Sequence, residues 1–125
     1  MNPSERILYV EDDPDIQAIA VMALEAVAGM TVEACSSGAE ALAAAEHFEP
    51  DLIVLDVMMP GMDGPSTLAA LRQKPALANT PVIFVTAKTQ SDEIQRLKGL
   101  GAIAVITKPF DPMTLGQQLR ALADQ

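Results

Sequence analysis

The sequence predicts an α/β fold, with a single doubly wound sheet of five parallel strands. Five short apolar runs alternate with five segments of helical periodicity along the whole chain. Such alternation is typical of a parallel sheet with helices on both faces, joined by right-handed crossovers. The run 51–55 continues after Asp51 with uninterrupted aliphatic residues, as expected of a strand buried on both faces. No repeat or linker interrupts the pattern, so we expect residues 1–125 to form one domain.

The predicted strands are short runs rich in branched aliphatic residues, and each is bounded by acidic residues, Gly or Pro. They span residues 7–10, 31–34, 51–55, 81–85 and 103–106. The run 31–34 is the weakest of them, because it contains Glu33 and has little apolar length. The order of the runs places one helical segment after every strand.

The predicted helices show apolar residues at helical spacing between recognisable start and stop signals. They span residues 15–28, 39–47, 66–72, 91–100 and 112–123. Gly29 ends the first helix, the Ser36–Gly38 segment opens the second, and Pro50 closes it. Ser91 is expected to cap the fourth helix, and Gly101 ends it.

The composition predicts an aliphatic core and excludes several functions. Half of the 125 residues are hydrophobic, but only 3% are aromatic and there is no Trp. The net charge of -9 has no basic run to offset it, so we expect no direct binding to nucleic acid. Residues 16–28 are too few to cross a bilayer, which takes about 20. The polar residues 1–6 show no secretory signal, so we expect a soluble, cytoplasmic protein.

Charged and hydroxyl side chains gather at the carboxyl ends of the predicted strands, where open α/β sheets bind their ligands. They are Glu11, Asp12 and Asp13 after the first strand, Asp56 after the third, Thr86 after the fourth and Lys108 after the fifth. Crowded carboxylates repel one another unless a cation or a proton relieves them. Oxygen ligands suit Mg2+, which binds one or two carboxylates together with a phosphate. A nucleophilic aspartate, a metal, an ammonium group and a hydroxyl are the components that phosphoryl transfer requires.

Four motifs, spread over nearly the whole chain, resemble the receiver domain of two-component response regulators. They occupy residues 7–13, 51–64, 81–87 and 108–110. The resemblance implies a CheY-like, flavodoxin-like (βα)5 fold with strand order 2-1-3-4-5. It also implies a phosphoacceptor switch that catalyses its own phosphotransfer and slow dephosphorylation and is otherwise not an enzyme.

The resemblance assigns the phosphoacceptor and a set of Mg2+ ligands. Asp56 takes the position of the phosphoacceptor. Because the family's acidic pair directly follows the apolar run, the metal-binding acids fall on Glu11 and Asp12, and Asp13 begins the loop to the first helix. Asp56 itself and the backbone carbonyl of Met58 complete the metal set implied by the family.

The remaining family positions concern the switch. Thr86 and Lys108 fall on the switch hydroxyl and the invariant lysine, and the Lys108–Pro109 bond is expected to be cis. Val105 stands where the family usually carries Tyr or Phe. A valine is short and stiff at χ1, so we expect no aromatic swing as the signal. Thr86 is still expected to move toward the phosphoryl group.

The expected partners follow from the family as well. Phosphate would come from a sensor histidine kinase or a histidine phosphotransfer domain. The switched surface would contact a downstream protein partner or effector domain, and a phosphorylation-dependent dimer stays open. We expect no membrane partner.

Three other functions compete with the switch. A degenerate receiver would act as a phosphorylation-independent scaffold, but every charged site position is filled. A Mg2+-dependent phosphohydrolase with an aspartyl-phosphate intermediate generally needs a second acid two residues after its nucleophile, where this chain has Met58. A nucleotide- or flavin-binding domain would need a phosphate cradle after the first strand, and Glu11–Asp13 would repel phosphate instead.

Overall fold

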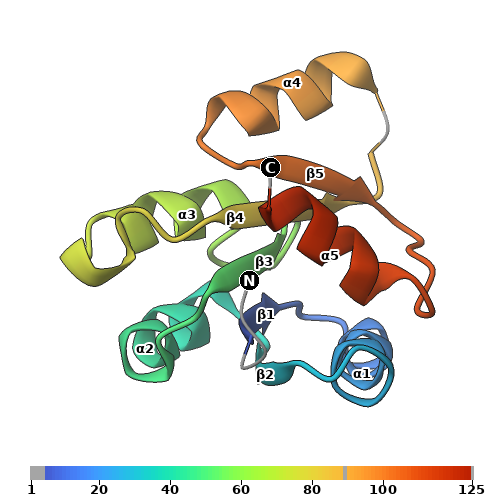
Figure 1. Ribbon diagram of the computed structural model, residues 1–125. Coiled ribbons are helices and arrows are strands. Elements are labelled where there is room, and N and C mark those ends of the chain that lie inside the picture. The colour runs from blue at the N-terminus through green and yellow to red at the C-terminus, as the bar shows by residue number, and fades with distance from the viewer. Residues whose placement is uncertain (1–4, 89, 125) are drawn as a thin grey trace.

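Five parallel strands form the centre of the fold in the computed structural model, which describes residues 5–88 and 90–124 (Figure 1). The strands are β1 (Arg6–Val10), β2 (Thr31–Cys35), β3 (Leu52–Asp56), β4 (Val82–Thr86) and β5 (Ala104–Thr107). Their order across the sheet is β2-β1-β3-β4-β5. Every neighbouring pair is parallel. The predicted fold class and strand order are confirmed.

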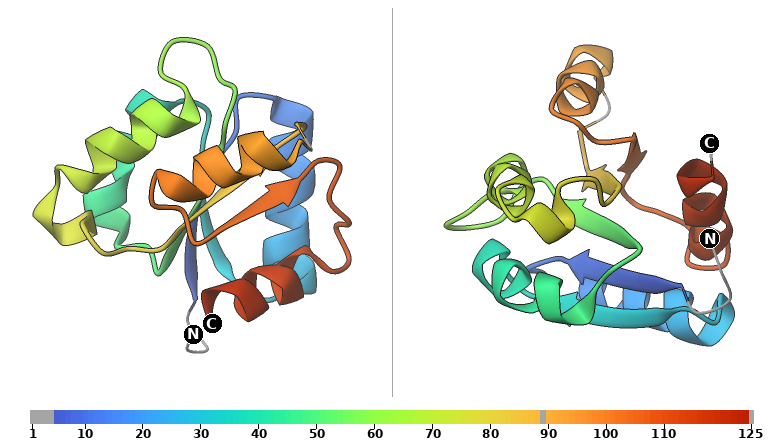
Figure 2. Two further views of the ribbon diagram at one scale, coloured as in Figure 1. Left: turned by 90° about the horizontal axis from the view of Figure 1, so that it is seen from above. Right: turned by 60° about the vertical axis from the view of Figure 1, so that its left-hand side comes forward.

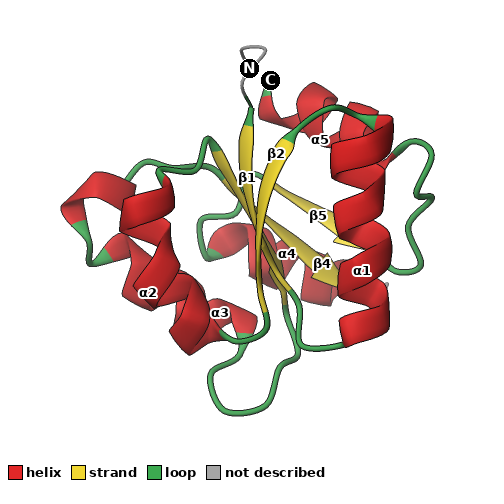
Figure 3. Cartoon of the chain, turned by 90° about the horizontal axis from the view of Figure 1, so that it is seen from below, coloured by secondary structure: helices red, strands yellow, loops and turns green. Residues whose placement is uncertain are grey.

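Helices cover both faces of the sheet (Figures 2 and 3). They are α1 (Pro14–Met22), α2 (Gly38–Phe48), α3 (Gly64–Arg72), α4 (Ser91–Gly99) and α5 (Leu115–Ala123). Alternate residues of β1 enter different apolar clusters. Leu8 packs in the cluster that contains residues of α2, α3 and α4, whereas Ile7 packs in the cluster that contains residues of α1 and α5. Both faces of the central strands are therefore buried, which explains their uninterrupted apolar sequence.

The first helix is not the continuous helix 15–28 that the periodicity predicts. A π-helical segment, Ala23–Val27, follows α1. It includes a hydrogen bond from the Ala28 N–H to the Ala23 carbonyl, five residues back. Because this wider turn changes the helical phase, Val27 is 46% exposed while Leu24 remains fully buried. Residues three apart lie on the same side of an α-helix, so a continuous α-helix would place Val27 beside Leu24.

Helix starts differ from the prediction in two places, for local reasons. Ser91 does not cap α4: it is the first residue of the helix, and the N-cap residue, Gln90, makes no side-chain capping bond. The last helix begins at Leu115 and not at residue 112, because Asp111 forms a turn before it. The Asp111 carboxylate accepts the Met113 N–H at 2.9 Å, and the Asp111 carbonyl accepts the N–H of Leu115 at 3.0 Å.

An ion pair between a half-buried arginine and a buried glutamate lies at the amino ends of the strands. Arg120 on α5 donates to both carboxylate oxygens of Glu5, with Nη2 2.6 Å from Oε1 and Nε 3.0 Å from Oε2. Its Nη2 also donates to the Ala28 carbonyl at 2.6 Å. Glu5 is only 4% exposed. This contact fixes α5 against the start of β1, far from the carboxyl ends of the strands.

None of the helices in the described part of the chain has the length and apolar character needed to span a bilayer.

Candidate functional site

Strand register places the acids after β1 and β3 next to each other. Val10 pairs with Leu55, so the next residues along the two strands, Glu11 and Asp56, are neighbours. The Glu11 N–H donates to the Cys35 carbonyl at 3.0 Å, which extends the ladder between β1 and β2 by one residue. Glu11 is 1% exposed and Asp56 5% exposed. The sheet thus holds two nearly buried carboxyl groups side by side.

Lys108 supplies a positive charge to both of these carboxyl groups. It directly follows β5, where its backbone N–H donates to the Thr86 carbonyl at 2.8 Å. Its Nζ lies 2.7 Å from Glu11 Oε1 and 3.0 Å from Asp56 Oδ1. Only 17% of the lysine side chain is exposed, so salt screens this pairing weakly. One ammonium group faces two carboxyl groups.

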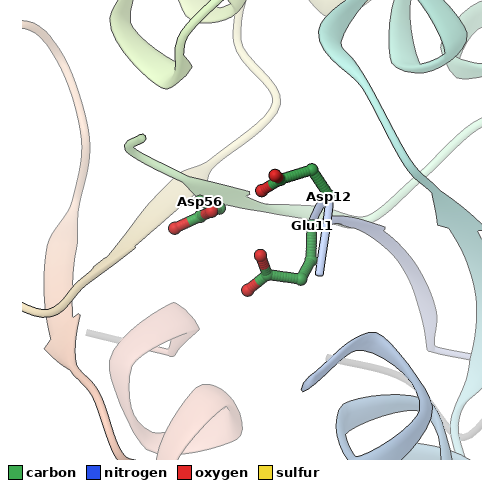
Figure 4. A group of neighbouring side chains, drawn as sticks. All are labelled: Glu11, Asp12 and Asp56. Atoms are coloured by element: carbon green, nitrogen blue, oxygen red, sulfur yellow. The ribbon is translucent and has the colours of Figure 1, made fainter. Parts of the chain in front are cut away.

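Asp12 adds a third carboxylate, and together the three fit a divalent cation. Oxygen atoms of Glu11, Asp12 and Asp56 all lie within 4.8 Å of one another. Figure 4 shows the Glu11 and Asp12 side chains extending from the end of β1 toward Asp56. Glu11 Oε1 is buried, and the Lys108 ammonium group lies 2.7 Å from it. This set of hard oxygen donors suits Mg2+.

The crowding of charge changes the pKa values in this cluster. Burial, followed by the adjacent Glu11 carboxyl group, raises the pKa of Asp56 to about 7, and Lys108 only partly opposes the shift. Burial by itself would lower the pKa of Lys108, but its contacts with the two carboxylates outweigh burial and raise it. Lys108 therefore stays charged near neutral pH, whereas further positive charge would favour the ionised form of Asp56.

Thr86 lies at the end of β4, on the other side of β3 from β1. Val85 pairs with Asp56, so Thr86 is one position further toward the same edge of the sheet. Thr86 is 2% exposed, and its Oγ1 accepts the Lys88 N–H at 3.1 Å. A hydroxyl can donate its own proton as well as accept, so Thr86 offers a donor beside the carboxylate cluster.

An open groove of about 650 Å³ runs beside the cluster, between the loop after β3 and α4. Met58, Lys88 and Arg96 are among the residues that line it. The Met58 side chain is 65% exposed, and it brings no polar group to the groove. The groove gives solvent and ligands access to the loop that directly follows Asp56.

Gly64 anchors the loop that leaves β3. Its N–H donates to the Val57 carbonyl at 2.8 Å. A Cβ atom on this glycine would lie 2.9 Å from Val57 Cα and closer still to the Asp56 carbonyl oxygen. The helix α3 begins at Gly64, and the Asp63 carboxylate accepts the Ser66 N–H at 2.8 Å as its N-cap. Glycine therefore permits the close return of the chain beneath Asp56.

Comparison with known families agrees with this arrangement of groups. The family model of the response regulator receiver domain matches residues 7–120. The chain belongs to this family. It is a receiver domain of the type found in two-component response regulators, which are signalling proteins.

Relatives of this receiver domain include longer proteins. Transcriptional regulatory protein TcrA of Mycobacterium tuberculosis is 42% identical over 119 residues, covering 94% of this chain and 46% of that protein. The alkaline phosphatase synthesis transcriptional regulatory protein PhoP of Bacillus subtilis is 38% identical over 121 residues, covering 95% and 48% respectively. The receiver domain thus spans about half the length of these relatives.

Among solved structures, the chemotaxis response regulator CheY4 of Vibrio cholerae superimposes with a TM-score of 0.88 at 34% identity. The match covers 95% of this chain and 98% of that one. This similarity agrees with the strand order and with the placement of helices on both faces of the sheet.

The receiver domain brings together the residues that the sequence singles out. Glu11, Asp12, Asp56 and Lys108 form one cluster, with Thr86 on the neighbouring strand. The cis Lys108–Pro109 bond is present as predicted. Val105 is half-buried and packs against the hydrophobic core that contains residues of α2, α3 and α4.

Sequence reasoning missed Gln17. This residue of α1 donates hydrogen bonds from Nε2 to backbone carbonyls at the ends of two strands. The signal in the sequence is a polar residue among the apolar residues that follow Asp15 in α1. Because its two closest partners are backbone carbonyls, one of them 18 residues away, no side-chain pattern marks the contact before the fold is known.

Proposed function

We propose that this receiver domain is a phosphoacceptor switch in which Asp56 accepts a phosphoryl group from a phosphohistidine donor. The donor would be a sensor histidine kinase or a histidine phosphotransfer domain, since response regulators interact with histidine kinases. The observation that carries the proposal is the Lys108 ammonium group within 3.0 Å of Asp56 Oδ1, inside a cluster of three carboxyl groups. A nearly buried aspartate beside a cation and a metal-binding set of oxygens is suited to attack phosphorus.

Each residue has a defined part in the proposed transfer. An Asp56 carboxylate oxygen forms a bond to phosphorus while the bond from phosphorus to the donor imidazole nitrogen breaks. The imidazole leaves with the electron pair and takes up a proton. Lys108 pairs with an oxygen of the transferred group, and the Thr86 hydroxyl donates a hydrogen bond to another.

Glu11, Asp12, Asp56 and the Met58 carbonyl would hold the Mg2+ ion. The ion supplies charge neutralisation for the phosphoryl oxygens and for the crowded carboxylates. It also favours the ionised, nucleophilic form of Asp56, whose pKa of about 7 would otherwise leave much of it protonated at neutral pH.

The added charge would operate the switch. A phosphoryl group brings about -1.5 to -2 charge to the rim of the sheet. Lys108 and Thr86 would rearrange around it. The Lys88 N–H donates to Thr86 Oγ1, so a movement of Thr86 would also shift the loop between β4 and α4 and the start of α4. An altered α4 surface would then change the affinity for a downstream protein partner or effector domain.

The phosphoryl group should be lost slowly by the standards of the family. Met58 and Lys88 line the groove beside Asp56, and the Met58 side chain has no group that can orient an attacking water. Met58→Asn should therefore shorten the lifetime of the phosphorylated protein, measured by intact mass after removal of the donor. A wild-type lifetime of only seconds in Mg2+ buffer would refute slow loss.

The central experiment is incubation with acetyl phosphate and Mg2+, with intact mass as the readout. We expect a gain of one phosphoryl group that disappears with Asp56→Asn and with EDTA. The control Asp15→Asn removes an exposed carboxylate near the site and should be phosphorylated like the wild type. No adduct on folded protein would favour a phosphorylation-independent scaffold, whereas repeated release of phosphate in large excess over protein would favour a phosphohydrolase.

A further inference from the structure

Gln17 connects α1 to the ends of two neighbouring strands. Its Nε2 lies 3.0 Å from the Glu11 carbonyl oxygen, 3.0 Å from the Cys35 carbonyl oxygen and 3.3 Å from Ser36 Oγ. A side-chain amide nitrogen carries two hydrogens, so the two carbonyls take both of them and Ser36 is the marginal partner. Since both close partners are carbonyl oxygens, the nitrogen of the amide must face them.

The backbone on which Gln17 acts is the backbone that carries the acidic pair. The Cys35 carbonyl also accepts the Glu11 N–H at 3.0 Å, so β2 holds the Glu11 N–H directly, and Gln17 holds the Glu11 carbonyl oxygen. A peptide group is planar. Fixing the Glu11 carbonyl oxygen therefore fixes the plane that it shares with the nitrogen and Cα of Asp12.

Asp12 depends on this plane more than the other acids of the cluster do. Glu11 and Asp56 are almost fully buried and each lies within 3.0 Å of the Lys108 ammonium group. Asp12 is exposed, and its carboxylate reaches the cluster from the first residue of a loop. A rotation of the preceding peptide group would move that carboxylate away from the other two.

The anchor of Gln17 is itself fixed. The Ser36 N–H donates to Glu40 Oε1 at 3.2 Å, and the Glu40 N–H donates to Ser37 Oγ at 3.1 Å. These two bonds resemble a capping box at the start of α2, except that Glu40 accepts the N–H of Ser36 instead of that of the N-cap residue Ser37. The end of β2 therefore presents a stable acceptor surface to the Gln17 amide.

We propose that Gln17 is a positioning residue for the divalent cation site. By holding the peptide group between Glu11 and Asp12, it keeps the Asp12 carboxylate in place to complete the acidic cluster. The inference rests on the proposed function in taking Mg2+ as the cation. A purely structural role, in which Gln17 only satisfies the Cys35 carbonyl, would affect folding but not the affinity for Mg2+.

The test compares Mg2+ binding to the wild type and to Gln17→Met, which keeps the length of the side chain but donates no hydrogen bond. By calorimetry, we expect the dissociation constant for Mg2+ to rise about tenfold, as when other partners that orient metal ligands are lost. With acetyl phosphate, the half-saturating Mg2+ concentration should rise by a similar factor, while the rate at saturating Mg2+ stays within about twofold. A higher half-saturating Mg2+ concentration with a nearly unchanged maximal rate identifies a defect in binding the cation, because the Asp12 carboxylate regains its orientation once the ion is bound.

Two further variants make the result decisive. Gln117→Met, at an exposed position of α5, should bind Mg2+ like the wild type. Gln17→Asn keeps the amide but is one methylene too short to reach both carbonyls, so it should also weaken binding, and it serves if Gln17→Met does not fold. An unchanged dissociation constant in a folded Gln17 variant, or equal weakening in Gln117→Met, overturns the proposal.

The failure of this inference differs from the failure of the proposed function. A wild type that binds Mg2+ but takes no phosphoryl group would count against the phosphoacceptor role, and the calorimetric comparison would still test Gln17. Normal phosphorylation of the wild type together with unchanged Mg2+ affinity in Gln17→Met would overturn the role of Gln17 alone.

Discussion

Replacing Asp56 by Asn should stabilise the metal-free protein, and more so at pH 7 than at pH 5. Burial and the neighbouring Glu11 raise the pKa of Asp56 from 3.8 to about 7 in the folded protein. Between the unfolded-state pKa of 3.8 and the folded-state pKa of about 7, the folded state binds more protons than the unfolded state. The stability of the wild type therefore falls as the pH rises through this range. This rise in the pKa of Asp56 sets an upper limit of about 4 kcal/mol on the stability lost at pH 7. At pH 5 the same relation gives about 2 kcal/mol. Asn stays neutral and avoids this penalty.

Urea unfolding followed by far-UV circular dichroism in EDTA would measure this effect at both pH values. The control Asp15→Asn removes an exposed charge from the first turn of α1 and should change stability by less than about 0.5 kcal/mol. Adding Mg2+ should reduce the difference in stability between Asp56→Asn and the wild type at pH 7, because the cation stabilises ionised Asp56 in the wild type. Equal stability of Asp56→Asn and the wild type at pH 7, or an advantage that does not change with pH, would refute the electrostatic reasoning.

Two other substitutions test the ion pairs at opposite edges of the sheet. Lys108→Met leaves Glu11 and Asp56 without their ammonium partner, so in EDTA at pH 8 the variant should lose about 2–4 kcal/mol of stability. The loss should be smaller at pH 5, because the two acids can protonate there. A loss that does not depend on pH in urea titrations would contradict this reasoning. Arg120→Met leaves the buried Glu5 carboxylate unpaired and should destabilise the folded protein by about 3 kcal/mol. The folded variant should still be phosphorylated at the rate of the wild type, because Arg120 lies at the opposite end of the strands from Asp56. A slower rate in the intact-mass assay would show that the two ends of the sheet are coupled.

The order of strands and helices follows from local features of the chain. The apolar run of β3 has no polar residue to face solvent, so it is expected to be central. The resemblance to the receiver family, through its strand order 2-1-3-4-5, then implied that the acids after β1 and β3 meet at the same end of the sheet. Element ends depend on side chain to backbone contacts that sequence shows less clearly. Asp111 delays the start of α5 through its own hydrogen bonds, and a Ser at the start of α4 looks like a cap although it is not one.

Sequence by itself determined which charged residues follow the strands, because strand ends and charged residue types are both visible in it. Asp56, Glu11, Asp12 and Lys108 could be named from their positions after apolar runs. Tertiary structure decided how their charges balance, since the pKa of Asp56 depends on burial and on the distance to Lys108. It also decided what holds the acidic loop, because the partners of Gln17 are backbone carbonyls that only the packing of α1 against the strand ends brings within reach.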